Sequence, residues 1–163
     1  MAETTTGKLT VTTPGERELL MKREFNAPRE LVFEAWTNPE HVSQWFGPRT
    51  FTLPVCEIDL RPGGRYHYVM RGPDGADYPM GGDFIEIDPP GRLVYTDRFE
   101  IEGMPERESV ITLTFEERDG KTFMTMHTLY QSAEDRDAVL AMGMVEGMTE
   151  TLDRLVELLE TLG

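Results

Sequence analysis

The sequence is poor in the residues that most often carry redox and metal chemistry. Cys56 is the only cysteine among 163 residues, so no internal disulfide can form, which favours a protein of the reducing cytoplasm. The histidines are His41, His67 and His127, and none of them stands in HExxH or another metal-ligand spacing. We therefore expect a cytoplasmic protein without a metal site.

Long apolar runs and nucleotide-binding loops are also missing. No run reaches the roughly 20 apolar residues that span a bilayer, and residues 1–14 are polar and threonine-rich, unlike a signal peptide. Neither a GxGxxG nor a GxxxxGKS/T loop occurs, and no serine stands in a GxSxG context. We expect no membrane segment and no cofactor.

Positive charge is scarce. The chain has 16 Lys and Arg against 30 Asp and Glu, which gives a formal net charge of -14. Nucleic-acid binding needs a basic surface, and so does attraction to an anionic membrane, so we expect neither partner. The simplest interpretation is that the charge keeps the protein soluble, with a cationic partner as the alternative.

Most of the chain alternates β-strand patterns with turn signals. Residues 1–15 are expected to be a flexible tail or an edge strand at 9–11, and residues 16–163 to form one domain. Two short helices are predicted, one from Asn26–Pro28 and one from Asn38–Pro39 to Gly47–Pro48. Strands are predicted at 18–25, 51–60, 65–71, 78–87, 92–101, 109–117 and 121–130.

From Asp135 to Leu162 the pattern becomes helical. Ser132 suits the N-cap position, with Asp135 as its capping-box partner. The apolar residues at helical spacing are Ala141, Met144, Val145, Met148, Leu152, Leu155, Leu159 and Leu162. Gly143 and Gly147 lie beside methionines, which indicates either an adaptable surface facing a ligand or close helix–sheet packing with methionine as gap filler.

This order of elements predicts an α+β helix-grip fold. A curved antiparallel sheet of six to seven strands would bury one face under two short helices and one long C-terminal helix, over an apolar cavity. The candidate ligand-binding residues are Trp36, Trp45, Tyr66, Tyr68, Met70, Phe84, Tyr95, Met126, Met144, Met148 and Leu152. An aromatic residue in a strand is more often part of the core than of a ligand site, so a purely structural role is the alternative for the aromatic residues of this set.

No catalytic residue is predicted, although carboxylates are abundant. Asp59 and Arg61 are expected to form a surface ion pair. Asp83 and Glu86 lie on a central strand, and a carboxyl that pointed inward there would have a raised pKa and could act as an acid or base.

Several of these segments resemble one known family. The segments are Arg23–Pro28, Val32–Glu40, Trp45–Pro48, Asp59–Gly64, Met70–Gly75, Pro89–Tyr95 and Gly143–Leu155. Together they resemble the SRPBCC, or START-like (Bet v-type), superfamily over residues 16–162. The most similar branch is related to the C-terminal domain of the heat-shock-protein-90 ATPase activator. The resemblance implies the helix-grip fold, but family members include lipid carriers, hormone receptors, aromatase/cyclases and co-chaperone domains.

Three functions follow as hypotheses. The first is non-covalent binding of a small apolar or aromatic ligand between sheet and helix, without catalysis. The second is a cyclase- or hydrolase-type enzyme that uses a pocket Tyr, His or carboxylate. The third is a chaperone-associated stress-response module, although only residues 1–15 precede the first confident strand, so direct chaperone stimulation is not expected. A weak homodimer through an edge strand is a further expected partner.

Overall fold

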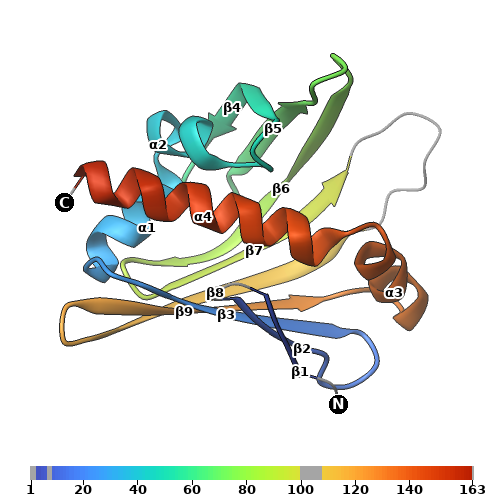
Figure 1. The fold of residues 1–163 in the computed structure, drawn as a ribbon, viewed down its shortest axis with the longest axis horizontal. Helices are drawn as coiled ribbons and strands as arrows, with labels where there is room; N and C mark the ends of the chain where they lie inside the picture. The colour runs from blue at the N-terminus through green and yellow to red at the C-terminus, as the bar shows by residue number, and fades with distance from the viewer. Residues whose placement is uncertain (1–2, 7–8, 100–107, 163) are drawn as a thin grey trace.

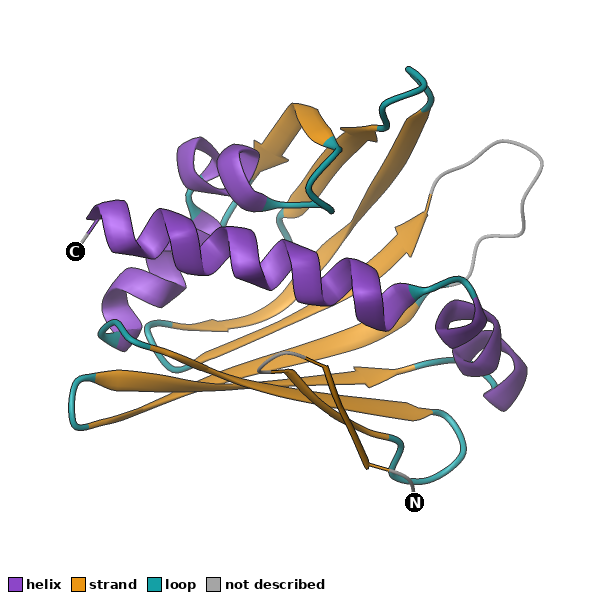
Figure 2. Cartoon of the chain, in the orientation of Figure 1, coloured by secondary structure: helices purple, strands orange, loops and turns teal. Residues whose placement is uncertain are grey.

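The structure, a computed structural model, describes residues 3–6, 9–99 and 108–162. It shows an α+β fold in which a curved, unclosed antiparallel sheet has a long helix, α4, lying across one face (Figure 1). Helices gather on this concave side of the sheet (Figure 2). The helix-grip architecture predicted from the sequence is therefore confirmed.

The described residues form nine strands. They are β1 (Glu3–Thr6), β2 (Leu9–Thr12), β3 (Glu18–Phe25), β4 (Thr52–Ile58), β5 (Arg65–Arg71), β6 (Asp77–Asp88), β7 (Arg92–Phe99), β8 (Ser109–Arg118) and β9 (Lys121–Leu129). Their order in the sheet is β1-β2-β3-β9-β8-β7-β6-β5-β4, and all neighbours are antiparallel.

The predicted count of six to seven strands is wrong at the N-terminus. All seven strands predicted between residues 18 and 130 are present, although the last residues of the segment 92–101 lie outside the described range. The additional strands are β1 and β2. The expected edge strand at 9–11 is β2, which pairs with β3, and β1 lies outside it as the actual edge. Leu9 and Val11 are buried in the core, so this segment is anchored by apolar contacts.

Strand alternation decides which side chains face the helices. On β8, Ile111, Leu113 and Phe115 are buried while the residues between them are half-buried. The sequence pattern of period two therefore fills the concave face with apolar side chains and leaves polar ones on the outer face.

The predicted single C-terminal helix is two helices, α3 (Ala133–Ala141) and α4 (Met144–Leu162). The Oγ atom of Ser132 accepts from the Asp135 amide at 3.1 Å, which confirms the predicted cap. Between the helices, Gly143 has a φ of +83°, a left-handed conformation that ends α3 and that a side chain would disfavour. Ala141, predicted on the apolar face, is consequently exposed.

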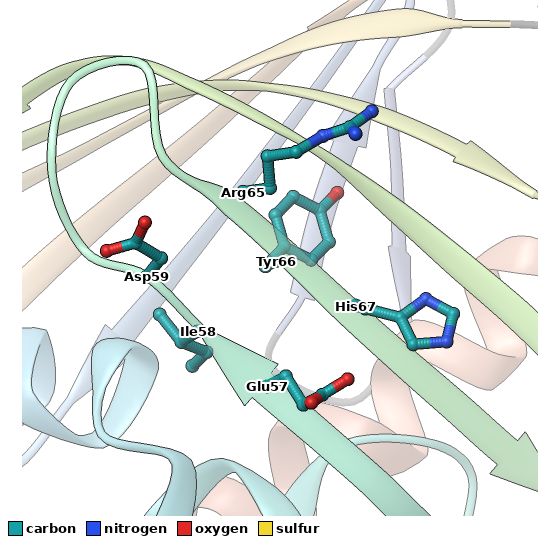
Figure 3. A pocket seen from close by; sticks show the side chains of 6 residues that line it. All are labelled: Glu57, Ile58, Asp59, Arg65, Tyr66 and His67. Atoms are coloured by element: carbon teal, nitrogen blue, oxygen red, sulfur yellow. The ribbon is translucent and has the colours of Figure 1, made fainter.

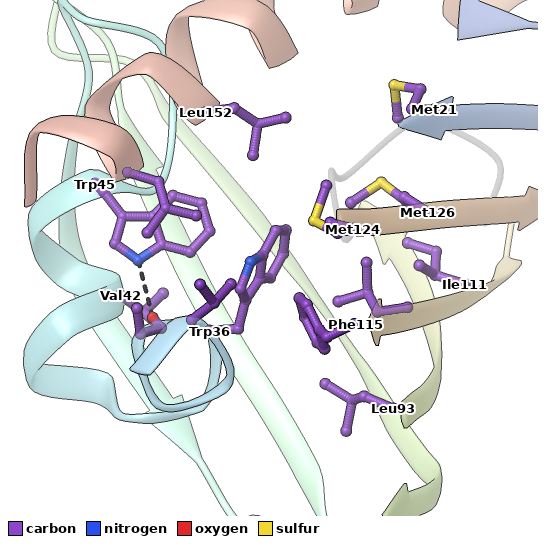
Figure 4. Packing of buried hydrophobic residues seen from close by; sticks show 14 of the residues in the cluster. Met21, Trp36, Val42, Trp45, Leu93, Ile111, Phe115, Met124, Met126 and Leu152 are labelled. Carbon is purple, nitrogen blue, oxygen red and sulfur yellow. Dashed lines mark hydrogen bonds between the residues drawn. The ribbon is translucent and has the colours of Figure 1, made fainter. Parts of the chain in front are cut away.

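The short helices α1 (Arg29–Thr37) and α2 (Pro39–Trp45) pack under the second half of α4. Pro39 has no N–H, so it cannot donate to the carbonyl of Ala35 one helical turn earlier. The Nε1 atom of Trp45 donates to that oxygen instead, at 2.9 Å (Figure 4). The α1–α2 corner is thus fixed by a buried indole. Within the described part of the chain, no helix combines the length and apolar character needed to cross a bilayer.

Candidate ligand-binding site

A row of aromatic rings crosses the concave face. It starts in the helices, where the ring centroids of Trp36 and Trp45 lie 4.8 Å apart, and Trp45 is 5.8 Å from Phe46. It passes to the sheet at Tyr68, whose ring is 5.0 Å from Phe46 and 4.9 Å from that of Tyr66. Tyr66 and Tyr68 share one face of β5, as strand alternation predicts.

The row ends at a cluster on β5, β6 and β7. The Tyr66 ring lies 5.7 Å from Phe84 and 5.5 Å from Tyr95, in an edge-on arrangement with Tyr95. Rings at these separations attract one another beyond their apolar contact. The cluster also provides polarizable ring surfaces on the side of the sheet that α4 crosses.

Asp97 supplies a carboxylate at this end of the row. It follows Tyr95 by two residues on β7, so both point to the concave face. The Tyr66 hydroxyl lies 2.7 Å from its Oδ1 atom and donates to it, and the same hydroxyl is 2.9 Å from the Thr96 carbonyl. The pair Tyr66–Asp97 is therefore an oriented acid–hydroxyl pair.

The ionisation of this cluster is shifted by its surroundings. Burial raises the pKa of Asp97 to about 6, against smaller lowering effects from the Tyr66 hydrogen bond and the Arg98 charge. Burial, and next the Asp97 charge, raise the pKa of Tyr66 and of Tyr95 far above the usual range. The same causes raise the pKa of Tyr130 to about 12, so the phenols stay protonated near neutral pH.

The two halves of α4 differ in how far they are covered. From Thr151 onward the helix is covered, and Leu152 and Leu155 are completely buried. In its first half, Met144, Val145 and Met148 are only half-buried, although they pack against the core cluster. The described buried residues of α4 begin at Thr151. The helix thus seals one half of the concave face more tightly than the other.

The predicted ligand-binding residues divide in the same way. Trp45, Met126 and Leu152 are at most 3% exposed and belong to the packed interior (Figure 4). Trp36, Tyr66, Tyr68 and Phe84 are also buried but contribute rings to the row. The half-buried members are Met70, Tyr95, Met144 and Met148.

The loop between α2 and β4 is clamped to α4. Arg154 donates from Nη1 to the carbonyls of Gly47 and Pro48, at 2.9 and 3.1 Å, and from Nη2 to that of Gln44, at 2.9 Å. Gly147 faces this loop, because a Cβ atom there would lie 3.7 Å from Pro48 Cγ. That distance is an ordinary van der Waals contact, so the packing against Pro48 does not by itself require a glycine at position 147.

Two hollows lined by described residues lie on the surface. One, of about 310 Å³, lies over the β4–β5 hairpin and is lined by Glu57, Ile58, Asp59, Arg65, Tyr66 and His67 (Figure 3). The other, of about 260 Å³, lies between α2 and α4. Neither lies between α4 and the sheet, so the predicted apolar cavity stays a prediction.

The carboxylates singled out from the sequence do not point inward. Asp83 accepts from Arg65 Nε at 2.9 Å, and Glu86 accepts from Arg92 Nε at 2.9 Å, in exposed pairs. The condition for an acid or base on β6, a carboxyl that points inward, is therefore not met. Asp83 pairs with Arg65 on the outer side, and the register shift between Phe84 and Glu86 turns Glu86 to the same side. Asp59 and Arg61 do form the predicted surface pair, with Nε and Oδ2 2.8 Å apart.

Metal and thiol chemistry find no support in the described residues. Among them, no group of three or more His, Cys, Asp or Glu could hold a metal ion. His127 contacts Glu18 at 2.8 Å on β3 and β9, away from His67 on β5. Burial raises the pKa of Cys56 to about 11, so its thiol is not activated.

Sequence reasoning missed two polar residues on the concave face. Arg23 follows Leu19 and Met21 at alternate positions of β3, and Asp97 follows Tyr95 on β7. A polar residue in an otherwise apolar alternation was the available signal. Arg23 is buried, and its Nε and Nη1 atoms have no hydrogen-bond partner; the same holds for Nε1 of Trp36.

Comparison with known proteins agrees with this architecture. A crystal structure of a Rhodobacter sphaeroides protein is 27% identical and covers 95% of this chain and 99% of its own, with a TM-score of 0.87. A Nitrosomonas europaea protein is 31% identical over 91% of this chain and 97% of its own, with a TM-score of 0.80. A Mycobacterium smegmatis protein is 32% identical over 91% and 96%, with a TM-score of 0.78.

No curated protein matches the chain. The family model described as "Activator of Hsp90 ATPase homolog 1-like protein" matches residues 26–160, which include α1, α2, β4 to β9 and most of α4. The residues matched are those that build the ring row and the Tyr66–Asp97 pair. The chain belongs to the family of Activator of Hsp90 ATPase homolog 1-like proteins.

Proposed function

We propose that the protein binds a small, mostly apolar molecule, non-covalently, on the concave face beneath the first half of α4. The observation that carries this proposal is the uneven cover of that face. Leu152 and Leu155 are completely buried, whereas Met144 and Met148 of the same helix remain half-buried, although they pack against the core cluster that contains the aromatic rings. Flexible, polarizable methionines opposite aromatic rings suit guests of irregular shape.

Moderate affinity is expected of such a site. A guest of about 20 heavy atoms that gains about 0.3 kcal/mol per atom binds with about 6 kcal/mol, or roughly tens of micromolar. The uncharged fluorophore N-phenyl-1-naphthylamine is a suitable probe, because its emission rises in apolar surroundings. We expect saturable enhancement with the wild-type protein.

The matched variants are Met148→Trp and Met142→Trp. Met148 is half-buried on α4, whereas Met142 is 76% exposed between the helices. A bulky side chain at 148 should occupy the guest's space and weaken probe binding at least about tenfold, while the same change at 142 should leave binding unchanged. Equal binding by both folded variants would contradict the proposal, as would a wild-type protein that fails to bind.

A second candidate is an enzyme that transfers protons through the Tyr66–Asp97 pair. The specific observation is a carboxyl whose pKa is raised to about 6 by burial and which accepts a hydrogen bond from a phenol. Such a group can act as an acid or base near neutral pH. Conversion, rather than retention, of a bound molecule in mass spectra, lost in Asp97→Asn, would favour this candidate. ATPase stimulation of a purified Hsp90 would instead favour a chaperone-associated role.

A further inference from the structure

The carboxylate of Asp97 lies on the concave face, and the neighbouring cation, Arg98, is paired with other carboxylates. Arg98, the next residue, points to the other side of β7 because successive strand residues alternate. Its Nη1 atom donates to Glu108 Oε2 at 3.2 Å and lies 3.9 Å from Asp83 Oδ2. Two other carboxylates therefore share the Arg98 charge, and Asp97 is left with the Tyr66 hydroxyl as its described hydrogen-bond donor.

The other cations beneath α4 are also engaged. Arg23, on the same face of the sheet, donates from Nη2 to Asp153 Oδ1 at 2.7 Å. Arg154 directs its guanidinium to the backbone carbonyls of the α2–β4 loop. Across the described residues, then, the concave face presents a carboxylate without a counter-cation. An ionised group in such surroundings gains strongly from a cation that reaches it.

Aromatic rings cluster around the tyrosine that donates to this carboxylate. Tyr66 donates to it, the rings of Phe84 and Tyr95 pack against Tyr66, and Tyr68 lies on the other side of Tyr66. The face of an aromatic ring attracts cations, and the attraction grows where water is excluded. A carboxylate beside several rings is the chemistry that recognises an ammonium group. The net charge of -14 adds a long-range attraction for cations.

We infer that the guest of the concave face is an apolar amine, with its ammonium nitrogen at Asp97 and its apolar part along the rings of Tyr66, Tyr95 and Phe84. This inference depends on the proposed function and specifies its ligand class. Neutral molecules of the same shape bind more weakly, and carboxylates are repelled. Arg23 does not reverse this preference, because its charge is paired with Asp153.

The selectivity for amines should depend on pH through Asp97. The charged and titratable groups that face or flank it are Tyr66 and Tyr68 on β5, Tyr95 and Arg98 on β7, and Tyr130 after β9. The four phenols have raised pKa values and stay neutral between pH 4.5 and 7.5. Asp97, with a pKa of about 6, is protonated at the lower pH and ionised at the higher one.

Three probes with one skeleton test the inference. They are 2-(2-naphthyl)ethylamine, 2-(2-naphthyl)ethanol and 2-naphthylacetate, measured by isothermal titration against the wild-type protein, Asp97→Asn and Asp88→Asn. Asp88 is an exposed residue at the end of β6, so its variant changes the net charge by the same amount away from the site. A thermal melt of each variant confirms folding.

At pH 7.5 the amine should bind the wild-type protein about tenfold more tightly than the alcohol, and the carboxylate more weakly than both. The amine preference should shrink to less than about twofold at pH 4.5 and in Asp97→Asn, and persist in Asp88→Asn. If amine and alcohol bind the wild-type protein equally, or if Asp97→Asn retains the preference, the inference is wrong while the proposed function stands. If none of the three binds, the proposed function fails as well.

Discussion

The guanidinium of Arg23 donates from Nη2 to Oδ1 of Asp153 over 2.7 Å and joins β3 to α4. The two partners are unequally buried, because the side chain of Arg23 is 4% exposed and that of Asp153 is 41% exposed. Two further nitrogens of Arg23 lack hydrogen bonds. The pair therefore fixes where α4 crosses the sheet at a cost in desolvation, and its two halves should respond differently to mutation.

Asp153→Ala should lower the free energy of unfolding by about 3 kcal/mol, because it leaves Arg23 as a buried charge without a partner. Arg23→Met should cost less, about 1 kcal/mol, because the buried charge is removed together with the hydrogen bond. Urea denaturation of both variants and of the double variant measures the difference. A single Asp153→Ala that costs no more than Arg23→Met would contradict this account.

Asp97→Asn should change how stability depends on pH. The pKa of Asp97 is raised from 3.8 to about 6 in the folded protein. Between these values the folded state holds a proton that the unfolded state has released, so the contribution of Asp97 is favourable below pH 3.8 and is lost as pH rises through 6. Asp97→Asn has no ionisable group at this position, so its stability does not fall for this reason as the pH rises. It should gain about 2 kcal/mol over the wild-type protein on going from pH 4 to pH 7.5.

Chemical denaturation at pH 4 and at pH 7.5 tests that expectation, with Asp88→Asn as the charge-matched control. The comparison between variants removes the common acid response of the other carboxyls. A constant difference between Asp97→Asn and the wild-type protein at both pH values would show that the Asp97 pKa is not raised.

The two tryptophans should not be equivalent. Trp45→Phe removes the only described donor to the Ala35 carbonyl, which Pro39 cannot reach with an N–H, and should cost about 2 to 4 kcal/mol. Trp36→Phe removes an indole N–H that has no partner, so part of its packing loss is offset and the cost should be about 1 to 2 kcal/mol. Thermal and urea unfolding give the ranking, and a reversed order would refute the hydrogen-bond argument.

Arg154 should control the order of the α2–β4 loop. Arg154→Met removes the hydrogen bonds to the Gly47, Pro48 and Gln44 carbonyls and should increase amide exchange across residues 47–51 at least about tenfold. Arg154→Lys should restore little of the protection from exchange. A single ammonium group cannot reach the Gln44 carbonyl and the Gly47 and Pro48 carbonyls at the same time. Glu157→Gln, which weakens the exposed contact with Arg49, is the control and should have a small effect. Unchanged exchange in Arg154→Met would show that the Arg154 hydrogen bonds do not order the loop.

The sequence was sufficient for the strands from β3 to β9 because their signals were local. Alternation and turn residues predicted the seven strands from Glu18 to Leu129, and Ser132 was correctly placed as a cap. The break at Gly143 was missed, because the apolar spacing continues through a single glycine while its left-handed backbone is visible only in three dimensions. In the N-terminal segment an edge strand at 9–11 was predicted as one alternative and is β2, whereas β1 was not predicted because its threonine-rich sequence gives little apolar contrast.

The candidate site was predictable in position but only partly in chemistry. The alternation of Tyr66 and Tyr68 placed them on the concave face, and the half-buried Met144 and Met148 belong to the helix that crosses that face. The indole of Trp45 donates to the Ala35 carbonyl, which lacks a backbone donor because Pro39 has no N–H. No pattern in the sequence predicts this contact. Asp97 was not predicted: the carboxylates singled out from the sequence lie on β6, whereas the one on the concave face continues the alternation of β7 and pairs with Tyr66.

The pairing of β3 with β9 has a consequence for how the chain folds. Residues 18–25 hydrogen-bond to residues 122–129, so this interior pairing of the sheet joins segments that are separated by most of the polypeptide. Closing so long a loop is entropically slow, and topologies dominated by distant contacts fold in roughly milliseconds to seconds. During synthesis the β4–β7 meander can form early. The β3–β9 pairing can form only after β9 has left the ribosome, and the edge of β3 that pairs with β9 is exposed until then.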